Sequence, residues 1–495
     1  MGNVRLSCPD QDERISKFMS KMMCAKWVAI LAASFIMAAA VARANPINLI
    51  HSFVGTDGAQ PNGGVVQAGN TLFGVTTVSG GTTGGKANTG TTFSVNTDGS
   101  QFTNLNTFGP VYFNSALNIS TNVGGANPVG TPVLSSNTLY GATLNGGLYG
   151  YGVIYSINTN GMEFTVLWNF SGTNGASAYP SLALAGGTLF GATEAGGTGN
   201  YGTVYKINTD GMEFTVLKNF IYTNGNYPDG GGLYGGLVVS NNVIYGTASL
   251  GGTNGYGLVF SMDTGGGNFS DLHSFQGTDG IKPFSGLTLS GTTLYGTTYQ
   301  GGTDGGGTVY ALNMDGSGFG VLHNFTNDPD GSSPEYGAPA VMGSILYGTT
   351  YAGGTGAGVV YQINTGGTGF SVIYDFVLGG TNGYDPVGGV LASGDTLIGT
   401  TFEGGTTGVA GTVYALELTP LNVVIDFIIG SPESSGTPLQ FSYHGTPGAK
   451  AIIQASEDLH TWDSLETNTL GTGSMVFTDS LATNFLKRFY RIALP

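Results

Sequence analysis

The chain has 495 residues, of which 88 are glycine, 9% are charged and 11% are aromatic. The glycines do not follow a G-X-Y rule, which excludes collagen, and the aromatic content excludes a disordered chain. The formal net charge of −16 opposes binding to nucleic acid, because it repels phosphates. At this length we expect at least two structural units.

Residues 1–44 differ from the rest of the chain. Lys21 and Lys26 precede the apolar run Trp27–Val41, which ends at Ala42-Arg43-Ala44. This order is typical of a secretory signal peptide, and the apolar run is short for a membrane span. We therefore expect a leader over 1–44, a mature protein that is extracellular or on the cell surface, and no integral membrane span after the leader is removed.

The remaining chain is strongly acidic and contains no cysteine. It carries 8 Lys/Arg against 27 Asp/Glu, which gives a formal net charge of −19, and both cysteines, Cys8 and Cys24, lie in the leader. Disulfides and thiolate metal sites are therefore excluded for the mature protein.

A motif of about fifty residues recurs seven times after the leader. Its most regular part is L-Y-G-T, whose glycine recurs at positions 74, 141, 191, 246, 296, 348 and 399. Each copy divides into four short runs rich in Val, Tyr, Phe and Thr. In one copy these runs are Ser285–Ser290, Thr293–Tyr299, Thr308–Asn313 and Phe319–Phe325. Seven such units predict an all-β fold, a seven-bladed β-propeller of four-stranded antiparallel blades.

The connections between the runs predict how the ring closes. The tight turns S-G-T-T and N-T-D-G should join neighbours within a blade, and the longer F-x-G-T-D/N-G-x-x-P should lead to the next blade. When the chain is divided into blades at these longer connections, Ile47–Phe53 lies before the first blade and the last blade, Gly388–Leu418, has only three strands. We expect Ile47–Phe53 to complete the last blade and remove an exposed edge. Val423–Phe427 resembles the same strand and is the alternative.

Two parts of the chain depart from the repeat. Gly109–Gly130 lengthens the connection after the first unit and should form an excursion on one face. Residues 421–495 lack the repeat and contain short runs typical of a small C-terminal β-sandwich, namely Leu439–Tyr443, Ala451–Gln454, Met475–Thr478 and Arg488–Ala493. The expected domains are a leader and signal peptide over 1–44, a propeller over 45–420 and a β-sandwich-like domain over 421–495.

The repeat resembles the GloVer tandem repeat of secreted bacterial proteins. The matching patterns are L-Y-G-T-T, G-G-x-x-x-x-G-x-V-Y-x-I-N, V-L-x-x-F and G-x-D/N-G-x-x-P, in seven copies over 47–418. The tail is similar to the small β domain often attached to such proteins, through Ser456–Trp462 and Phe489-Tyr490-Arg491. The resemblance implies an exported repeat protein and no particular reaction, because no catalytic residues define the repeat family.

The histidines carry no metal or catalytic pattern. His51, His273 and His323 occupy one repeat position, which other copies fill with Asn, Trp, Lys or Tyr. We expect this position on the solvent side of an outer strand, and three separate blades would hold the histidines too far apart to share a metal ion. The sequence has no G-x-S-x-G, H-E-x-x-H or phosphate-loop motif. We therefore expect no catalytic, cofactor-binding or metal-binding residues.

The long loops are the expected place for ligand binding, because binding residues usually lie on loops held by a rigid scaffold. G-T-D/N-G-x-x-P and Y-x-G-G-T-x-G-x-G should lie on one face, opposite the tight hairpins. Their Asx side chains can hold the turn backbone. They could instead bind calcium, the one cofactor considered, although the spacing of an EF-hand is absent. The candidate ligand-binding residues are Asp57, Asn174, Asp279, Asp330, Glu335, Asn382 and Asp385.

These patterns favour a secreted, non-catalytic repeat protein that acts as an extracellular binding or interaction scaffold. Its partner would be a polysaccharide or a cell-surface protein. The alternative is an extracellular polysaccharide-acting enzyme with its site on the loop-rich face. An enzyme should carry unmatched acidic or basic residues on one or two blades. The unmatched features here are chiefly Gly109–Gly130 and Asp328-Pro329-Asp330 with Glu335.

Overall fold

The computed structural model describes residues 47–418, except 79, 84–85, 116–117, 180 and 407–409, and six strands between 424 and 493. The leader predicted over 1–44 lies outside the described residues, as do residues 457–462 of the tail motif. All secondary-structure elements in the described part of the chain are β-strands.

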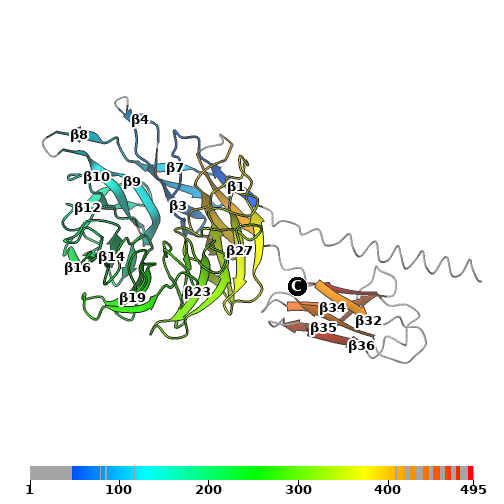
Figure 1. Ribbon diagram of the computed structural model, residues 1–495. Helices are drawn as coiled ribbons and strands as arrows, with labels where there is room; N and C mark the ends of the chain where they lie inside the picture. Colours follow the sequence, from blue (N-terminus) through cyan, green and yellow to red (C-terminus); the bar gives the residue numbers. More distant parts are fainter. Residues whose placement is uncertain are drawn as a thin grey trace, which may run out of the picture. The chain divides into compact units, whose positions relative to one another are not determined.

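Seven antiparallel sheets follow one another around a central axis, six with four strands and one with five (Figure 1). This confirms the predicted seven-bladed propeller. Blades 1 to 3 consist of β2 (Val66–Ala68), β3 (Thr71–Thr76), β6 (Thr91–Asn96) and β7 (Thr103–Thr107); then β8 (Tyr112–Asn114), β9 (Ile119–Ser135), β10 (Thr138–Gly147), β11 (Val153–Asn158) and β12 (Thr165–Asn169); then β13 (Ala183–Ala185), β14 (Thr188–Thr193), β15 (Thr203–Asn208) and β16 (Thr215–Asn219).

The remaining blades repeat the same order from the inner to the outer strand. Blades 4 to 7 consist of β17 (Val238–Ser240), β18 (Val243–Ala248), β19 (Leu258–Asp263) and β20 (Ser270–Ser274); β21 (Thr288–Ser290), β22 (Thr293–Thr298), β23 (Thr308–Asn313) and β24 (Gly320–Asn324); β25 (Ala340–Met342), β26 (Ile345–Thr350), β27 (Val359–Asn364) and β28 (Ser371–Asp375); and β29 (Leu391–Ser393), β30 (Thr396–Thr401), β31 (Thr412–Glu417) and β1 (Ile47–Ser52). A small separate pair is formed by β4 (Thr82–Thr83) and β5 (Lys86–Ala87).

The inner strands are shorter than predicted. The run predicted over Ser285–Ser290 pairs with its neighbour only from Thr288, as β21. The Ser285 hydroxyl oxygen accepts a hydrogen bond from the backbone N–H of Thr297 at 3.1 Å. The Ser285 side chain thus takes the place of a backbone–backbone hydrogen bond of the sheet, at the point where the chain runs toward the axis.

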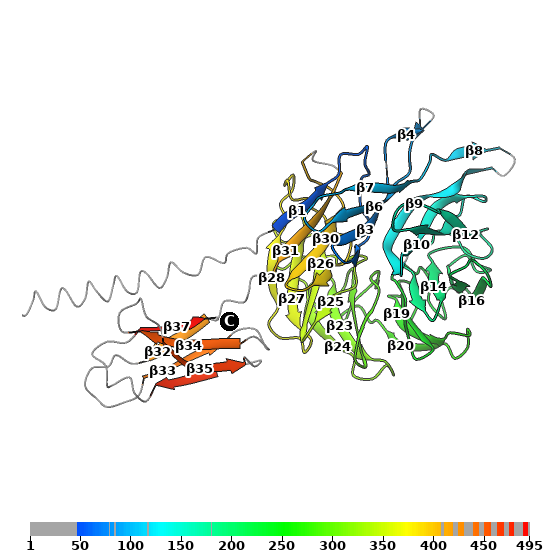
Figure 2. The ribbon, with the colours of Figure 1, turned by 180° about the vertical axis from the view of Figure 1, so that it is seen from behind.

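The ring closes with the N-terminal strand (Figure 2). β1 pairs with β31 from Ile47 opposite Leu416 to Ser52 opposite Thr412. The prediction that Ile47–Phe53 completes the last blade is confirmed. The alternative, Val423–Phe427, is wrong for this slot, because β32 (Val424–Ile429) pairs with β33 in the tail instead.

The tail contains two three-stranded sheets, β32-β33-β36 and β35-β34-β37. The strands besides β32 are β33 (Leu439–His444), β34 (Lys450–Ser456), β35 (Asp463–Thr469), β36 (Met475–Asp479) and β37 (Phe489–Ala493). The four predicted runs correspond to β33, β34, β36 and β37. β35 was not predicted, because its sequence, DSLETNT, lacks an alternating apolar pattern.

The insertion Gly109–Gly130 widens one blade. β8 pairs with the first part of β9, with Tyr112 opposite Thr121. The predicted excursion is therefore a β-structure that makes the sheet of blade 2 five-stranded.

The hydrophobic core lies between the blades, in seven clusters that each join two neighbouring sheets. The cluster between blades 4 and 5, for example, combines Tyr245 and Val259 with Leu294 and Tyr310. One cluster brings Val413 of blade 7 onto the strands of blade 1. Each sheet thus buries both of its faces, which explains why the runs are apolar with little alternation.

The two long loop types lie on the same face, as predicted. They pair with each other through single bridges, such as Ile281 with Gln300 in blade 5 and Ala176 with Ala195 in blade 3. The loops of this face are therefore hydrogen-bonded to one another and are not independent.

Candidate functional site

Five of the predicted ligand-binding residues hold the connections between blades. Asp57, for example, accepts hydrogen bonds from His51 Nε2 at 3.0 Å and from the Val54 N–H at 2.8 Å. Burial alone would raise the pKa of Asp57, but these bonds and the nearby imidazole lower it. Asp279 and Asp330 make the same pair of contacts, Asn174 accepts from the Ser171 N–H, and Asn382 donates to the Tyr374 hydroxyl. Asp57, Asn174, Asp279 and Asp330 thus show the predicted backbone-holding role, whereas Asn382 bonds a side chain.

The repeated histidine position is not on the solvent side of the outer strand, so that prediction is wrong. The side chains of His51, His273 and His323 are only 16–18% exposed. The His273 ring stacks on Phe319 of the next blade with centroids 3.5 Å apart. Trp168 fills the same position by stacking on Phe214, and Lys218 by placing Nζ 4.0 Å from the centre of Phe269. In these five blades the side chain at this position covers a phenylalanine of the next blade.

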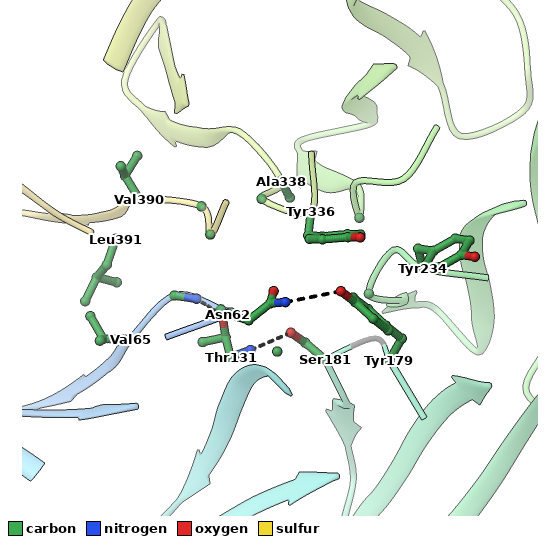
Figure 3. A pocket seen from close by; sticks show the side chains of 18 of the residues that line it. Asn62, Val65, Thr131, Tyr179, Ser181, Tyr234, Tyr336, Ala338, Val390 and Leu391 are labelled. Atoms are coloured by element: carbon green, nitrogen blue, oxygen red, sulfur yellow. Dashed lines mark hydrogen bonds between the residues drawn. The ribbon is translucent and has the colours of Figure 1, made fainter. Parts of the chain in front are cut away.

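All seven blades contribute to a cavity of about 320 Å³ at the ring axis (Figure 3). Its wall consists largely of backbone from the runs that lead into the inner strands. A Cβ on Gly63 would lie 2.5 Å from the Gly130 carbonyl carbon, and one on Gly337 would lie 2.2 Å from the Gly389 nitrogen. Neighbouring runs therefore touch, and side chains are excluded there. One residue of each blade along this wall is Gly63, Gly130, Ser181, Gly236, Gly286, Gly337 and Gly388.

Threonines of the L-Y-G-T motif hold this wall together. In three blades the threonine hydroxyl donates to a carbonyl of the next blade's axial run: Thr247 to Ser285, Thr349 to Gly388 and Thr400 to Gly63, at 2.7–2.9 Å. The motif therefore links neighbouring blades at the axis.

Four aromatic rings gather at the mouth of the cavity, just before the inner strands of blades 3 to 6. We call them the axial aromatic cluster: Tyr179, Tyr234, Phe284 and Tyr336. The Tyr179 and Tyr336 rings lie 4.7 Å apart, and Tyr234 lies 5.5 Å from Tyr179 and 4.8 Å from Phe284. All four side chains are only partly buried. The other blades place Asn62, Val129 and Val387 at this position, so the mouth is not seven-fold symmetric.

Polar groups join the cluster across the axis. Asn62 Nδ2 donates to the Tyr179 hydroxyl oxygen at 3.1 Å (Figure 3). The Tyr179 and Tyr336 rings pack against each other with centroids 4.7 Å apart, and Glu335 directly precedes Tyr336 in the chain. On the other side, the Tyr234 hydroxyl donates to Glu194 Oε1 at 2.6 Å. The rings are thereby fixed in orientation.

Four acidic residues are linked to this mouth by contact, chain position or charge, and we call Glu194, Glu335, Asp385 and Glu403 the axial carboxylates. Glu194 bonds Tyr234, Glu335 precedes Tyr336, and Asp385 interacts electrostatically with both Glu335 and Glu403. Burial, with a smaller contribution from the charge of Asp385, raises the pKa of Glu335 to about 7 against the lowering effect of its bond to Tyr336. Burial and the charge of Glu403 raise the pKa of Asp385 to about 6. The Glu403 carboxylate accepts a hydrogen bond from the Tyr384 hydroxyl at 3.0 Å. Two of the predicted site residues, Glu335 and Asp385, thus lie in the runs that lead to this mouth.

The described residues offer no group of three or more His, Cys, Asp or Glu side chains that could hold a metal ion. Within the same residues, no helix is long and apolar enough to cross a membrane.

Comparison with known sequences identifies the repeat. Residues 110–235 and 226–341 match the model of the Gloeobacter/Verrucomicrobia repeat. Residues 110–341 of the chain carry the Gloeobacter/Verrucomicrobia repeat. The resemblance to the GloVer repeat is thereby confirmed. The comparison with curated proteins gives no match.

Solved structures similar to this repeat protein share its fold only distantly. An oligogalacturonate lyase in complex with manganese is 11% identical, with a TM-score of 0.45 over 76% of this chain and 93% of that one. The β-propeller domain of the Trilobed protease from Pyrococcus furiosus is 10% identical, with a TM-score of 0.43 over 73% and 98%. At this distance the likeness says nothing about activity.

The axial aromatic cluster was not predicted from the sequence of the repeats. Phe284 follows the proline of G-x-x-P, and the equivalent residue is Asn62 in blade 1 and Val387 in blade 7. A signal was present, since four copies carry an aromatic residue at this position and three do not, whereas the residues beside it are mostly proline or glycine. Aligning the seven copies on the L-Y-G-T glycine would have shown this difference.

Proposed function

We propose that the protein is a secreted, non-catalytic binding scaffold that holds a glycan at the axial mouth of its propeller. The observation that supports this proposal is the axial aromatic cluster, four partly exposed rings over a cavity on the loop-rich face. Aromatic faces pack against the apolar faces of sugar rings, and nearby hydroxyls and carboxylates can bond sugar hydroxyls.

Secretion and the domain plan belong to the same proposal. The basic-apolar-small pattern of residues 1–44 supports export. We take 45–420 as the propeller and 421–495 as a β-sandwich-like domain, supported by the two three-stranded sheets of the tail.

A glycan array with the intact mature protein tests the binding function, run with and without calcium. We expect at least one glycan to be bound, and we expect Tyr336→Ala to weaken that binding at least about tenfold. Tyr256→Ala is the control, because Tyr256 is 39% exposed at a different place, against Gly277 of a connection between blades. Binding of no glycan, or equal loss in both variants, would contradict the proposal.

A polysaccharide-acting enzyme is the second candidate, and a specific observation favours it. Glu335 and Asp385 are interacting carboxyls with pKa values of about 7 and about 6, and enzymes that cleave glycosidic bonds use pairs of carboxyls in different protonation states. Reducing-end release from a polysaccharide, lost in both Glu335→Gln and Asp385→Asn, would establish this activity. Asp330, which holds a connection through His323, should not be required.

A further inference from the structure

The axial mouth concentrates negative charge around aromatic rings. Glu194 accepts a hydrogen bond from the Tyr234 hydroxyl, and Glu335 directly precedes Tyr336 in the chain. Asp385 interacts electrostatically with both Glu335 and Glu403. The carboxylates come from blades 3, 6 and 7, so they are spread over several blades of the ring.

Little positive charge is available to balance these groups. Residues 47–418 contain four lysines and no arginine. Lys218 is paired with Asp229 at 2.9 Å, Lys206 lies within β15 and Lys86 within β5. Only Lys282 lies in a run that leads into the axis, at the repeat position that Asp385 fills in blade 7. Among the runs that lead into the axis, one lysine therefore stands against the four carboxylates.

This environment discriminates between ligands by charge. An acidic glycan would be repelled, and a neutral one would desolvate the carboxylates without a counter-charge. A cation at the mouth gains from both surrounding groups, because aromatic faces attract cations and carboxylates bond ammonium groups. It would also relieve the mutual repulsion of the carboxylates.

We propose that the glycan bound at the axial mouth contains amino sugars, whose ammonium groups lie between the axial aromatic cluster and the axial carboxylates. This inference rests on the proposed function and names its ligand class.

Calorimetric titration of the mature protein with three oligosaccharides of equal length tests the inference. The probes are a glucosamine oligomer, its N-acetylated counterpart and a neutral glucose oligomer. We expect the glucosamine oligomer to bind at least about tenfold more tightly than the other two, and this preference to shrink as salt is raised.

Paired variants assign the preference to the axial mouth. We expect Glu194→Gln with Glu335→Gln to reduce the preference to less than about threefold while binding of the N-acetylated oligomer persists. Glu163→Gln with Glu213→Gln is the matched control, because it makes the same two substitutions at exposed turn-flanking residues. It should keep the preference.

The outcomes separate the two proposals. Equal binding of the glucosamine and N-acetylated oligomers, or a preference that survives in the axial double variant, would overturn the amino-sugar inference and leave glycan binding standing. If none of the three probes binds and the glycan array is also negative, both proposals fail.

Discussion

The L-Y-G-T motif requires glycine because an aromatic ring approaches its backbone closely, and not because of its backbone conformation. A Cβ on Gly296 would lie 2.4 Å from the Tyr310 hydroxyl oxygen and 2.6 Å from its Cζ. The equivalent glycines 74, 141, 191, 246, 348 and 399 meet Phe93, Tyr155, Tyr205, Phe260, Tyr361 and Tyr414 in the same way. In each blade, a buried aromatic ring thus packs directly against the backbone of this glycine.

Replacing this glycine should destabilise the fold. We expect Gly296→Ala to lower the free energy of unfolding by at least about 2 kcal/mol, because Tyr310 is fully buried and has no room to move. Gly320→Ala in the same blade is the control, since its Cβ would meet nothing within 4 Å. It should be neutral or slightly stabilising. Urea unfolding measures both, and equal midpoints for the two variants would refute this explanation.

The hydroxyls of the buried tyrosines differ in their hydrogen bonding. Among the described residues, the hydroxyl of Tyr310 has no partner, whereas that of Tyr155 lies 3.2 Å from Thr92 Oγ1. Burial raises the pKa of both phenols, to about 12 for Tyr155. Two other blades use phenylalanine at this position, Phe93 and Phe260.

This difference predicts opposite effects of the same substitution. We expect Tyr310→Phe to leave the unfolding free energy unchanged or raise it by up to about 1 kcal/mol, because a buried unpaired hydroxyl is removed. Tyr155→Phe should lower it by about 1 kcal/mol, because a hydrogen bond is lost and Thr92 is left unpaired. The measurement is chemical denaturation of the two variants side by side; a larger loss for Tyr310→Phe would show that its hydroxyl is bonded.

The carboxyl of Glu335 should make stability depend on pH. Its pKa rises from 4.5 to about 7 on folding, so the folded protein holds the proton more tightly than the unfolded chain. Stability should therefore fall as pH rises from 4.5 through 7, by no more than about 3 kcal/mol because the group is partly exposed to water. Glu335→Gln should then match the wild type near pH 4 and exceed its melting temperature at pH 8. An unchanged difference across this range would disprove the assignment.

At the scale of elements, the ring depends on one short strand. β1 supplies the outer strand of blade 7, and Phe53, which follows it, is fully buried in the cluster between blades 7 and 1. Without β1 the edge of β31 would be exposed and that cluster would lose its closing side.

Truncation tests this dependence. We expect removal of residues 1–44 to leave the melting temperature of the propeller unchanged, and removal of residues 1–53 to lower it sharply or prevent folding. Losing Phe53 alone should cost about 3–5 kcal/mol. Differential scanning calorimetry of the two truncated chains makes the comparison. Equal transitions would mean that the closing pair contributes little.

At the scale of the molecule, the repeat predicts the fold well and the site poorly. Seven in-phase copies determine blade number, strand order and the closing strand, because each copy independently supports the same phase. The site depends on the few positions where copies differ, such as Asn62 against Tyr179, and on which of them meet at the axis. Glu335 and Asp385 were found because they are acidic, whereas Phe284 and Tyr336 resemble the many aromatic core residues of a blade. Only their place around the propeller axis distinguishes these two residues from the aromatic core residues.

The register of the closing pair has a mechanical consequence. Ile47, where the propeller begins, lies opposite Leu416, close to where it ends. A force that pulls the two chain ends apart therefore acts at one end of the β1–β31 ladder and loads its hydrogen bonds one after another. Strands pulled in this unzipping direction separate at lower force than strands that slide along each other, because in sliding all bonds carry the load together. Tension along the chain should thus open the ring at this ladder before any blade is lost.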